Sequence, residues 1–292
     1  MTALTDALGA GPEDRLLILT ADHLGMCHSS NVGVYESLRS GLATGATLMV
    51  PGPWARDAAS HYRGEPVGVQ LTLNAELDSY RWRPITHAPS LLDGDGGFPR
   101  TVEDLWDHAD LDEVLRECRA QLERAILWGF DVSHLSTHMG ALQTRPEFFD
   151  VYMDLAVDFR LPIRLESRNA EEAAGFPFRS LAAEEGVLSV DHHSLRRLAE
   201  PSTLERAAMD LAPGVTEITL EPASDTPELR ALCHGWGRRV EHRDLDPDVA
   251  YMTGRCKVEG DYAAFVFGLR PVFGSRDWSG MLADLAERTD FG

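Results

Sequence analysis

Residues 15–31 read RLLILTADHLGMCHSSN, and this stretch guides the interpretation of the whole chain. The apolar run Leu16–Leu19 has the length of a buried strand, and it leads to Asp22 and His23. A turn at Gly25 follows, and the run SSN offers capping side chains for a helix that begins near residue 32. Parallel α/β folds gather catalytic groups at the carboxyl ends of their strands, so the stretch indicates a site. A single aspartate after a strand also commonly caps a turn, and both interpretations stay open at this point.

Composition narrows the class of protein. The chain has 292 residues, 43% of them hydrophobic, which is enough for one large α/β domain or two ordinary ones. A net charge of -20 argues against a nucleic-acid partner or an anionic membrane surface. No apolar run reaches the roughly 20 residues of a membrane span. The N-terminus lacks a basic region and the four cysteines lack metal-site spacing, so we expect no signal peptide and a reduced, cytoplasmic protein.

Strand-like and helix-like segments alternate along the chain. Apolar runs predict strands at 16–19, 46–50, 67–74, 132–138, 161–165, 187–190 and 215–220. Helical spacing predicts helices at 32–40, 54–62, 101–128, 148–159, 179–185 and 203–211, with weaker ordered candidates at 262–269 and 281–286. This alternation predicts an α/β fold of mainly parallel strands closed into a barrel. We expect residues 1–13 to form a flexible N-terminus and residues 14–292 a single domain, divergent from about residue 245.

Four of the predicted strands end in side chains that bind metals or move protons. These side chains are Asp22 and His23, Gln70, His134 and His138, and Glu221. A lone histidine on a strand is more commonly a hydrogen-bonded core residue. In a barrel, however, the four strand ends converge on one face, and the combination favours an active site there.

A long irregular segment follows the third predicted strand. Residues 78–100 contain three prolines and three glycines, and a connection of this length is commonly functional. Arg81, Trp82 and Arg83 could line a pocket for a polar ligand. The alternative is that Trp82 pins the segment to the core, and the sequence favours neither.

The motifs ILTADHLGMCHSSN, GVQLTLNAELDSYRWRPIT, SHLSTHMG and GVTEITLEPASDTPELRAL, with LPIRL and GFPFRSLAAEEG, resemble the YdjC/ChbG-like carbohydrate deacetylases of the polysaccharide deacetylase group. The resemblance implies a distorted (β/α) barrel and a divalent metal ion, zinc before iron or magnesium. It also implies that one aspartate of an A-D-D-x-G motif is the general base and the other binds the metal. Two histidines complete that metal site, and a late His-Pro supplies an acid. The metal polarises the acetyl carbonyl and a bound water.

This sequence departs from the family pattern at three of those positions. His23 replaces the second aspartate, Gln70 replaces the histidine of the G-V-H-L strand, and Glu221 replaces the late histidine, whereas Asp22 and His138 are retained. The resemblance therefore implies catalytic roles for Asp22 and Glu221. It also implies that His23, His138 and Glu221 bind the metal, with Gln70 as a weaker ligand. Two imidazoles and a carboxylate suit zinc hydrolysis or non-haem iron. His134 is expected to support the ligands or the core.

Three functions remain open from the sequence. The first is a metal-dependent hydrolase with a rewired site that deacetylates an amino sugar or a related metabolite. The second is a tailoring metalloenzyme acting on a non-sugar metabolite, and the third is a metal-free homologue that binds a ligand or performs acid/base catalysis. The expected partner is a small molecule, a sugar by resemblance, contacted by Arg81, Trp82, Arg83 and Arg164 near the mouth of the barrel. We expect no nucleic-acid or membrane partner, and a homodimer stays open.

Overall fold

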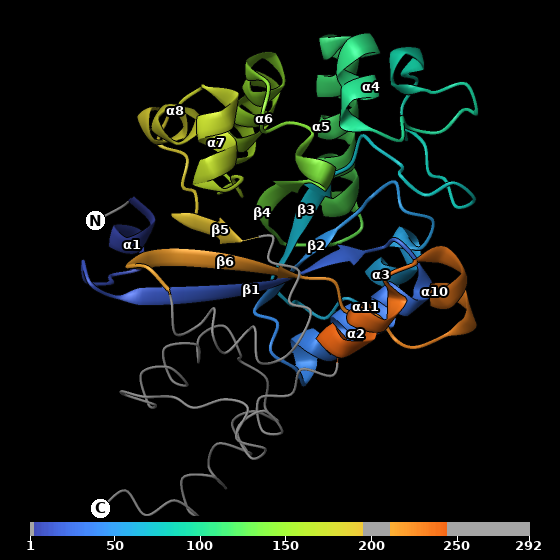
Figure 1. Cartoon of the computed structure of the whole chain (residues 1–292), viewed down its shortest axis with the longest axis horizontal. Helices are drawn as coiled ribbons and strands as arrows, with labels where there is room; N and C mark the ends of the chain where they lie inside the picture. Colours follow the sequence, from blue (N-terminus) through green and yellow to red (C-terminus); the bar gives the residue numbers. More distant parts are fainter. Residues whose placement is uncertain (1–2, 195–210, 244–292) are drawn as a thin grey trace, which may run out of the picture.

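The computed structural model describes residues 3–194 and 211–243. Within these residues, six parallel strands form one sheet in the order β4-β3-β2-β1-β6-β5 (Figure 1). The strands are β1 (Arg15–Leu24), β2 (Gly45–Leu48), β3 (Val67–Leu71), β4 (Val132–Thr137), β5 (His192–Ser194) and β6 (Gly214–Leu220). β1 lies inside the sheet and pairs with β6 along seven residues, from Arg15 opposite Gly214 to Ala21 opposite Leu220. β1 is therefore hydrogen-bonded to a strand on each side, as expected for a buried strand of a parallel sheet.

The sheet curls, and its two edges are linked through a segment between β4 and β5. Ile163 forms parallel bridges both to Leu135 of β4 and to Ser189, three residues before β5. The strand predicted at 161–165 is thus reduced to the two bridges of Ile163, and the strand predicted at 187–190 to the one bridge of Ser189. The predicted distorted barrel of mainly parallel strands is confirmed, and its carboxyl ends bring several predicted site residues to one face.

Helices cover the strands on two sides in Figure 1, with α4 to α8 on one side and α2, α3, α10 and α11 on the other. Their bounds are α1 (Ala3–Ala7), α2 (His28–Arg39), α3 (Ala55–His61), α4 (Val102–His108), α5 (Leu111–Leu127), α6 (Pro146–Phe159), α7 (Arg168–Ala174), α8 (Phe178–Glu184), α10 (Pro227–Leu232) and α11 (Trp236–Arg243). Two 3₁₀ turns, η1 (Pro89–Leu91) and η2 (His138–Gly140), follow β3 and β4. A short helix, α1, thus lies within the N-terminal segment 1–13.

Two helix predictions were wrong in detail, for identifiable reasons. The single helix predicted at 101–128 is two helices, because the side chain of Asp110 accepts a hydrogen bond from the backbone N–H of Glu113 and caps a new start. α2 begins at His28 rather than near residue 32, with Cys27 as its N-cap. Asn31 accepts a hydrogen bond from the backbone N–H of Gly25 and donates to the carbonyl of Trp54, so it braces the turn after β1.

Some predictions fall outside the residues that the structure describes. They are most of the helix at 203–211, the ordered candidates at 262–269 and 281–286, and the extension from about residue 245. Among the described helices, none combines the length and the apolar character that crossing a membrane requires.

Candidate active site

His23 occupies a bulge at the carboxyl end of β1. The pairing of β1 with β2 changes register between Ala21 and Leu24, on either side of His23. The backbone φ of His23 is 71°, in the left-handed region that few residues other than glycine adopt, although histidine and aspartate are enriched there. A bulge re-aims the side chain away from the regular alternation of a strand. Consequently Asp22 and His23, which are adjacent in sequence, both have buried side chains at the end of β1.

Asp22 belongs to a buried ion-pair network with Arg164 and Glu217. The Arg164 guanidinium donates from Nη1 and Nη2 to the two carboxylate oxygens of Asp22, at 2.7 and 3.0 Å. It also donates from Nε and Nη2 to Oε1 of Glu217, at 2.9 and 2.7 Å. Thr47 Oγ1 and Gln70 Nε2 add two further donors to Asp22, at 2.6 and 3.3 Å. Four donors match the roughly four lone-pair positions of a carboxylate, so Asp22 has little capacity left for another proton donor.

Glu217 is the second carboxylate of this network and was not predicted. It is 3% exposed and also accepts a hydrogen bond from Thr20 Oγ1 at 2.6 Å. Burial raises its pKa, but Arg164, with His193 and His134, more than offsets burial, and the pKa of Glu217 falls to about 2. The Asp22 and Glu217 carboxylates are therefore both paired with the single guanidinium of Arg164.

A second group of side chains, which we call the imidazole cluster, contains His23, His138, Glu76 and Glu221. The rings of His23 and His138 lie edge to face with their centroids 5.5 Å apart. His138 Nε2 lies 2.8 Å from Glu76 Oε2, so this imidazole is paired with a carboxylate. Burial raises the pKa of Glu76, but His138, together with a backbone hydrogen bond and His23, more than offsets burial, and the pKa falls to about 2. Glu76 was not predicted from the sequence. The signal that could have identified it is the position of an acid two residues after the third predicted strand.

Glu221 joins the cluster from the segment that follows β6. Its side chain is 40% exposed, and Oε2 lies 3.3 Å from Nε of Arg239 on α11. Its backbone N–H donates to Nδ1 of His242 on the same helix. Burial would raise the pKa of Glu221, but the nearby charges of His23 and Arg239 lower it, so Glu221 is an ionised and accessible carboxylate at neutral pH.

The four residues predicted to contact substrate lie in different surroundings. Arg164 is 4% exposed and lies in the ion-pair network, not at the mouth. Trp82 is 2% exposed, and its indole N–H donates to the carbonyl of Asn74, so it anchors the segment 78–100. Arg81 pairs with Asp93 inside the same segment, whereas Arg83 is exposed. Trp82 still reaches the cluster, since its ring centroid lies 6.0 Å from that of His138.

His134 lies on β4, four residues before His138, and is half-buried against the neighbouring strand. A Cβ added to Gly68 on β3 would lie 2.6 Å from its ring, so the glycine leaves the space that the imidazole fills. Burial lowers the pKa of His134, and its Nε2 has no hydrogen-bond partner among the described residues. This position is consistent with a supporting role.

The buried imidazole of His23 is expected to make stability depend on pH. Burial lowers its pKa from 6.5 to about 4, so the folded state resists protonation that the unfolded chain accepts. The free energy of unfolding should therefore fall as pH decreases from about 6.5 to 4, by about 3 kcal/mol in total at 1.36 kcal/mol per pKa unit. Urea unfolding of wild type and His23→Gln between pH 7 and pH 5 measures this dependence of the free energy of unfolding on pH. The range lies above the pH at which the folded protein's carboxylates with lowered pKa values titrate. His134, whose pKa is also lowered, contributes to this pH dependence in both proteins. The variant should therefore show a shallower dependence of unfolding free energy on pH than wild type, and an unchanged dependence would contradict the prediction.

The donors present do not fit the divalent metal that the family resemblance implies. Among residues 3–194 and 211–243, no group of three or more His, Cys, Asp or Glu side chains is arranged to hold a metal ion. Asp22 is committed to Arg164, and His138 is committed to Glu76. Within the part of the chain that the structure describes, His23 Nδ1 and Gln70 Oε1 are buried without a hydrogen-bond partner, but an imidazole and an amide oxygen are a weak pair of ligands. We therefore assign no chemical step to a metal.

Two substitutions are expected to create a metal site at this position. His23→Asp with Gln70→His supplies a carboxylate and an imidazole beside His138, and aspartate tolerates the left-handed backbone at position 23. With zinc at 100 times its Kd, the double variant should gain about 2.7 kcal/mol in free energy of unfolding. Thermal melts with and without zinc, and metal analysis after desalting, provide the measurement. The same variant carrying His138→Ala is the control and should lose the gain; a double variant that does not respond to zinc would show that the geometry is unsuitable.

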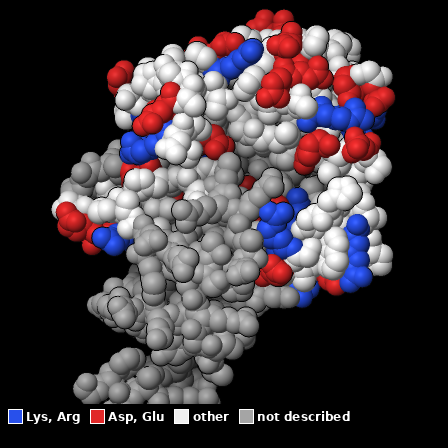
Figure 2. Space-filling view, in the orientation of Figure 1, with Lys and Arg blue, Asp and Glu red and all other residues white. Residues whose placement is uncertain are grey.

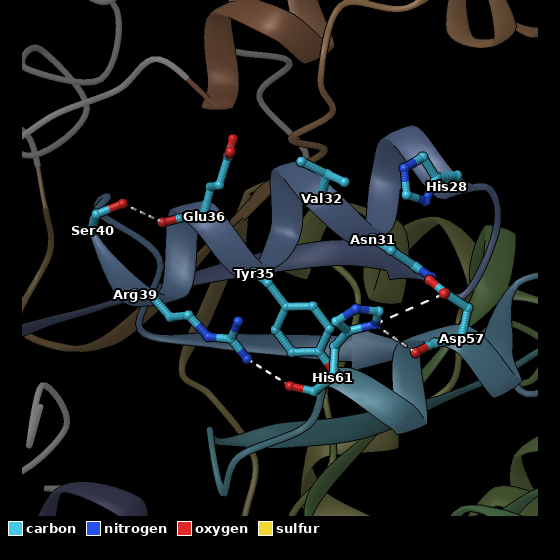
Figure 3. A pocket seen from close by; sticks show the side chains of 9 residues that line it. All are labelled: His28, Asn31, Val32, Tyr35, Glu36, Arg39, Ser40, Asp57 and His61. Atoms are coloured by element: carbon cyan, nitrogen blue, oxygen red, sulfur yellow. Dashed lines mark hydrogen bonds and ion pairs between the residues drawn. The ribbon is translucent and has the colours of Figure 1, made fainter.

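A separate cavity of about 390 Å³ lies between α2 and α3 (Figure 3). Its lining includes His28, Tyr35, Asp57 and His61, and no member of the imidazole cluster. Its walls are already paired, because Asn31 donates to Asp57 and Arg39 donates to the carbonyl of His61.

On the face shown in Figure 2, the described acidic side chains are scattered with basic ones among them.

Comparison with known proteins identifies the relationship. A family model described as YdjC-like protein matches residues 16–263. A carbohydrate deacetylase of Thermus thermophilus is 40% identical over 238 residues, covering 78% of this chain and 85% of the relative. A chitooligosaccharide deacetylase of Yersinia pestis (strain Pestoides F) is 25% identical over 248 residues, covering 72% and 94%. A crystal structure from Enterococcus faecalis V583, described as a candidate cellobiose-phosphate cleavage protein, superposes with a TM-score of 0.70 at 22% identity, over 86% of this chain and 99% of the other, and it supports the fold. The chain therefore belongs to the YdjC-like family.

Proposed function

We propose that this protein is a hydrolase that removes an acetyl group from an N-acetylated sugar. The observation that carries the proposal is the imidazole cluster, in which the His138–Glu76 pair lies beside His23 at the carboxyl ends of β1 and β4. Relatives named as carbohydrate and chitooligosaccharide deacetylases support the substrate class. The position of the cluster supports it further, since active sites of parallel barrels lie at this end.

The roles follow from exposure and charge. Glu221 is ionised and accessible, so it takes a proton from water while the water oxygen bonds to the acetyl carbon. The amide C–N bond then breaks, and the departing nitrogen takes a proton from His138, which Glu76 orients. The new carboxyl group loses its proton to solvent and the proton on Glu221 passes to His138, so the products are acetate and the amine and both side chains return to their starting states. Asp22 and Arg164 hold the end of β1 in place, and a divalent metal takes part in no step of this proposal.

The test is acetate release from a panel that includes N-acetylglucosamine and di-N-acetylchitobiose. We expect release by wild type, a loss of about 10²–10⁴-fold in His138→Ala, and no loss in His108→Ala, which changes an exposed histidine on α4. Running each assay with and without a chelator measures metal dependence directly. If no sugar in the panel releases acetate, the sugar substrate is wrong and an acid/base enzyme for a non-sugar metabolite becomes the better proposal.

A further inference from the structure

A second imidazole–carboxylate pair, Glu166 and His193, lies near the imidazole cluster and has no role in the proposed hydrolysis. Glu166 follows Arg164 by two residues, just after the bridging residue Ile163. Arg164 points into the barrel towards Asp22. The side chain of Glu166 lies beside His193 and Gly140 and is 18% exposed.

His193 holds this carboxylate from the neighbouring strand. It lies in β5, its imidazole is 1% exposed, and Nδ1 is 3.8 Å from Glu166 Oε2. The other ring nitrogen, Nε2, lies 3.1 Å from Thr219 Oγ1 on β6, which fixes the orientation of the ring. Nδ1 is buried and makes no hydrogen bond within the described ranges, so it faces Glu166 at ion-pair distance without a closer partner. Burial would raise the pKa of Glu166, but His193 and Arg164 lower it, and the carboxylate is charged at neutral pH.

The turn that carries His138 leaves room for Glu166. Gly140 is the last residue of η2, two residues after His138, and a Cβ added there would lie 3.1 Å from Glu166 Oε1. Its φ of +69° also disfavours any larger residue. On the other side, Thr219 lies two residues before Glu221 in the segment that carries both side chains. Glu166 thus lies next to the turn that carries His138, and His193 connects it to the strand that leads to Glu221.

We propose that Glu166 binds hydroxyl groups of the sugar ring at the mouth of the barrel, with His193 as its positioning residue. A carboxylate accepts hydrogen bonds from two adjacent hydroxyls, and a charged acceptor contributes about twice as much as a neutral one. The inference rests on the proposed function for its substrate class. It adds a subsite that recognises the ring instead of the acetyl group.

Binding measured apart from turnover tests the subsite. Calorimetric titration with di-N-acetylchitobiose is expected to show binding about 10- to 100-fold weaker in Glu166→Ala than in wild type. Glu166→Gln should lie between the two, because an amide keeps the shape and one acceptor. His193→Gln should also weaken binding, and in acetate release it should raise KM far more than it lowers kcat. Glu185→Gln, at an exposed carboxylate where α8 ends, is the matched control and should bind as wild type.

The outcomes separate the two proposals. If di-N-acetylchitobiose binds wild type and Glu166→Ala weakens that binding, the subsite is supported even if no acetate is released. In that case only the hydrolase proposal fails. Equal binding by wild type, Glu166→Gln and Glu166→Ala, each with a wild-type melting temperature, would overturn the subsite. Absence of binding to wild type would also overturn it. A change in kcat without a change in binding or KM would move Glu166 from recognition to chemistry.

Discussion

Arg164→Met is expected to lower the free energy of unfolding by about 3–5 kcal/mol, the cost of leaving buried charge without its partner. Arg164 is 4% exposed and is the counter-charge for Asp22 and Glu217, which are themselves 5% and 3% exposed. Methionine has a similar length but no charge, so two carboxylates would remain in the barrel interior without a cation between them. Urea unfolding at pH 7 measures the change, and the melting temperature should fall with it.

A surface arginine and a compensated variant serve as controls. Arg230 pairs with Asp225 at the surface with 54% of its side chain exposed, and Arg230→Met should leave stability close to wild type. Adding Asp22→Asn and Glu217→Gln to Arg164→Met removes the uncompensated charges and should restore a large part of the loss. If Arg164→Met is as stable as Arg230→Met, the buried network is not what holds these strand ends together.

The sequence predicted the fold well because its signals were local. The apolar run of β1, the alternation in β3 and the helical spacing of α5 and α6 each depend on neighbouring residues. The predicted convergence of strand ends follows from the barrel, and it brings the rings of His23 and His138 together, with Asp22 next to His23 in the chain. These residues could therefore be named before any contact was known.

The partners of those residues could not be named, because each pairing depends on distant parts of the chain. Arg164 is 142 residues from Asp22, and Glu76 is 62 residues from His138. An arginine in the short run LPIRL looks like a mouth residue, but only the fold shows that it points inwards. α11 was missed because WGRRVEHR is short and strongly charged, although it brings Arg239 and His242 to Glu221.

The buried arginine also bears on how this branch of the family could work. In a site built around a metal, the cation provides the positive charge at the end of β1. Here a guanidinium, fixed by four hydrogen bonds to two carboxylates, provides it from within the chain. Because the bonds to Arg164 engage both oxygens of Asp22, an assignment of Asp22 as general base has to compete with this structural role.

Glu221→Gln is expected to reduce turnover by about 10²–10⁴-fold, the usual loss when a general base is removed. The substitution keeps the shape of the side chain, which is 40% exposed, so the melting temperature should stay near that of wild type. Asp22→Asn is expected to behave in the opposite way. It removes half of the counter-charge of Arg164, so it should lower the melting temperature clearly, while folded protein below that temperature retains more activity than Glu221→Gln.

The comparison decides between two carboxylates that the sequence could not separate. Both variants are assayed on the sugar that releases acetate with wild type, at a temperature where circular dichroism shows each to be folded. A folded Asp22→Asn that loses about 10²–10⁴-fold, beside a Glu221→Gln that stays near wild type, would make Asp22 the base. It would also mean that at least one of the four donors from Thr47, Gln70 and Arg164 leaves the Asp22 carboxylate when substrate binds, because together they already surround it.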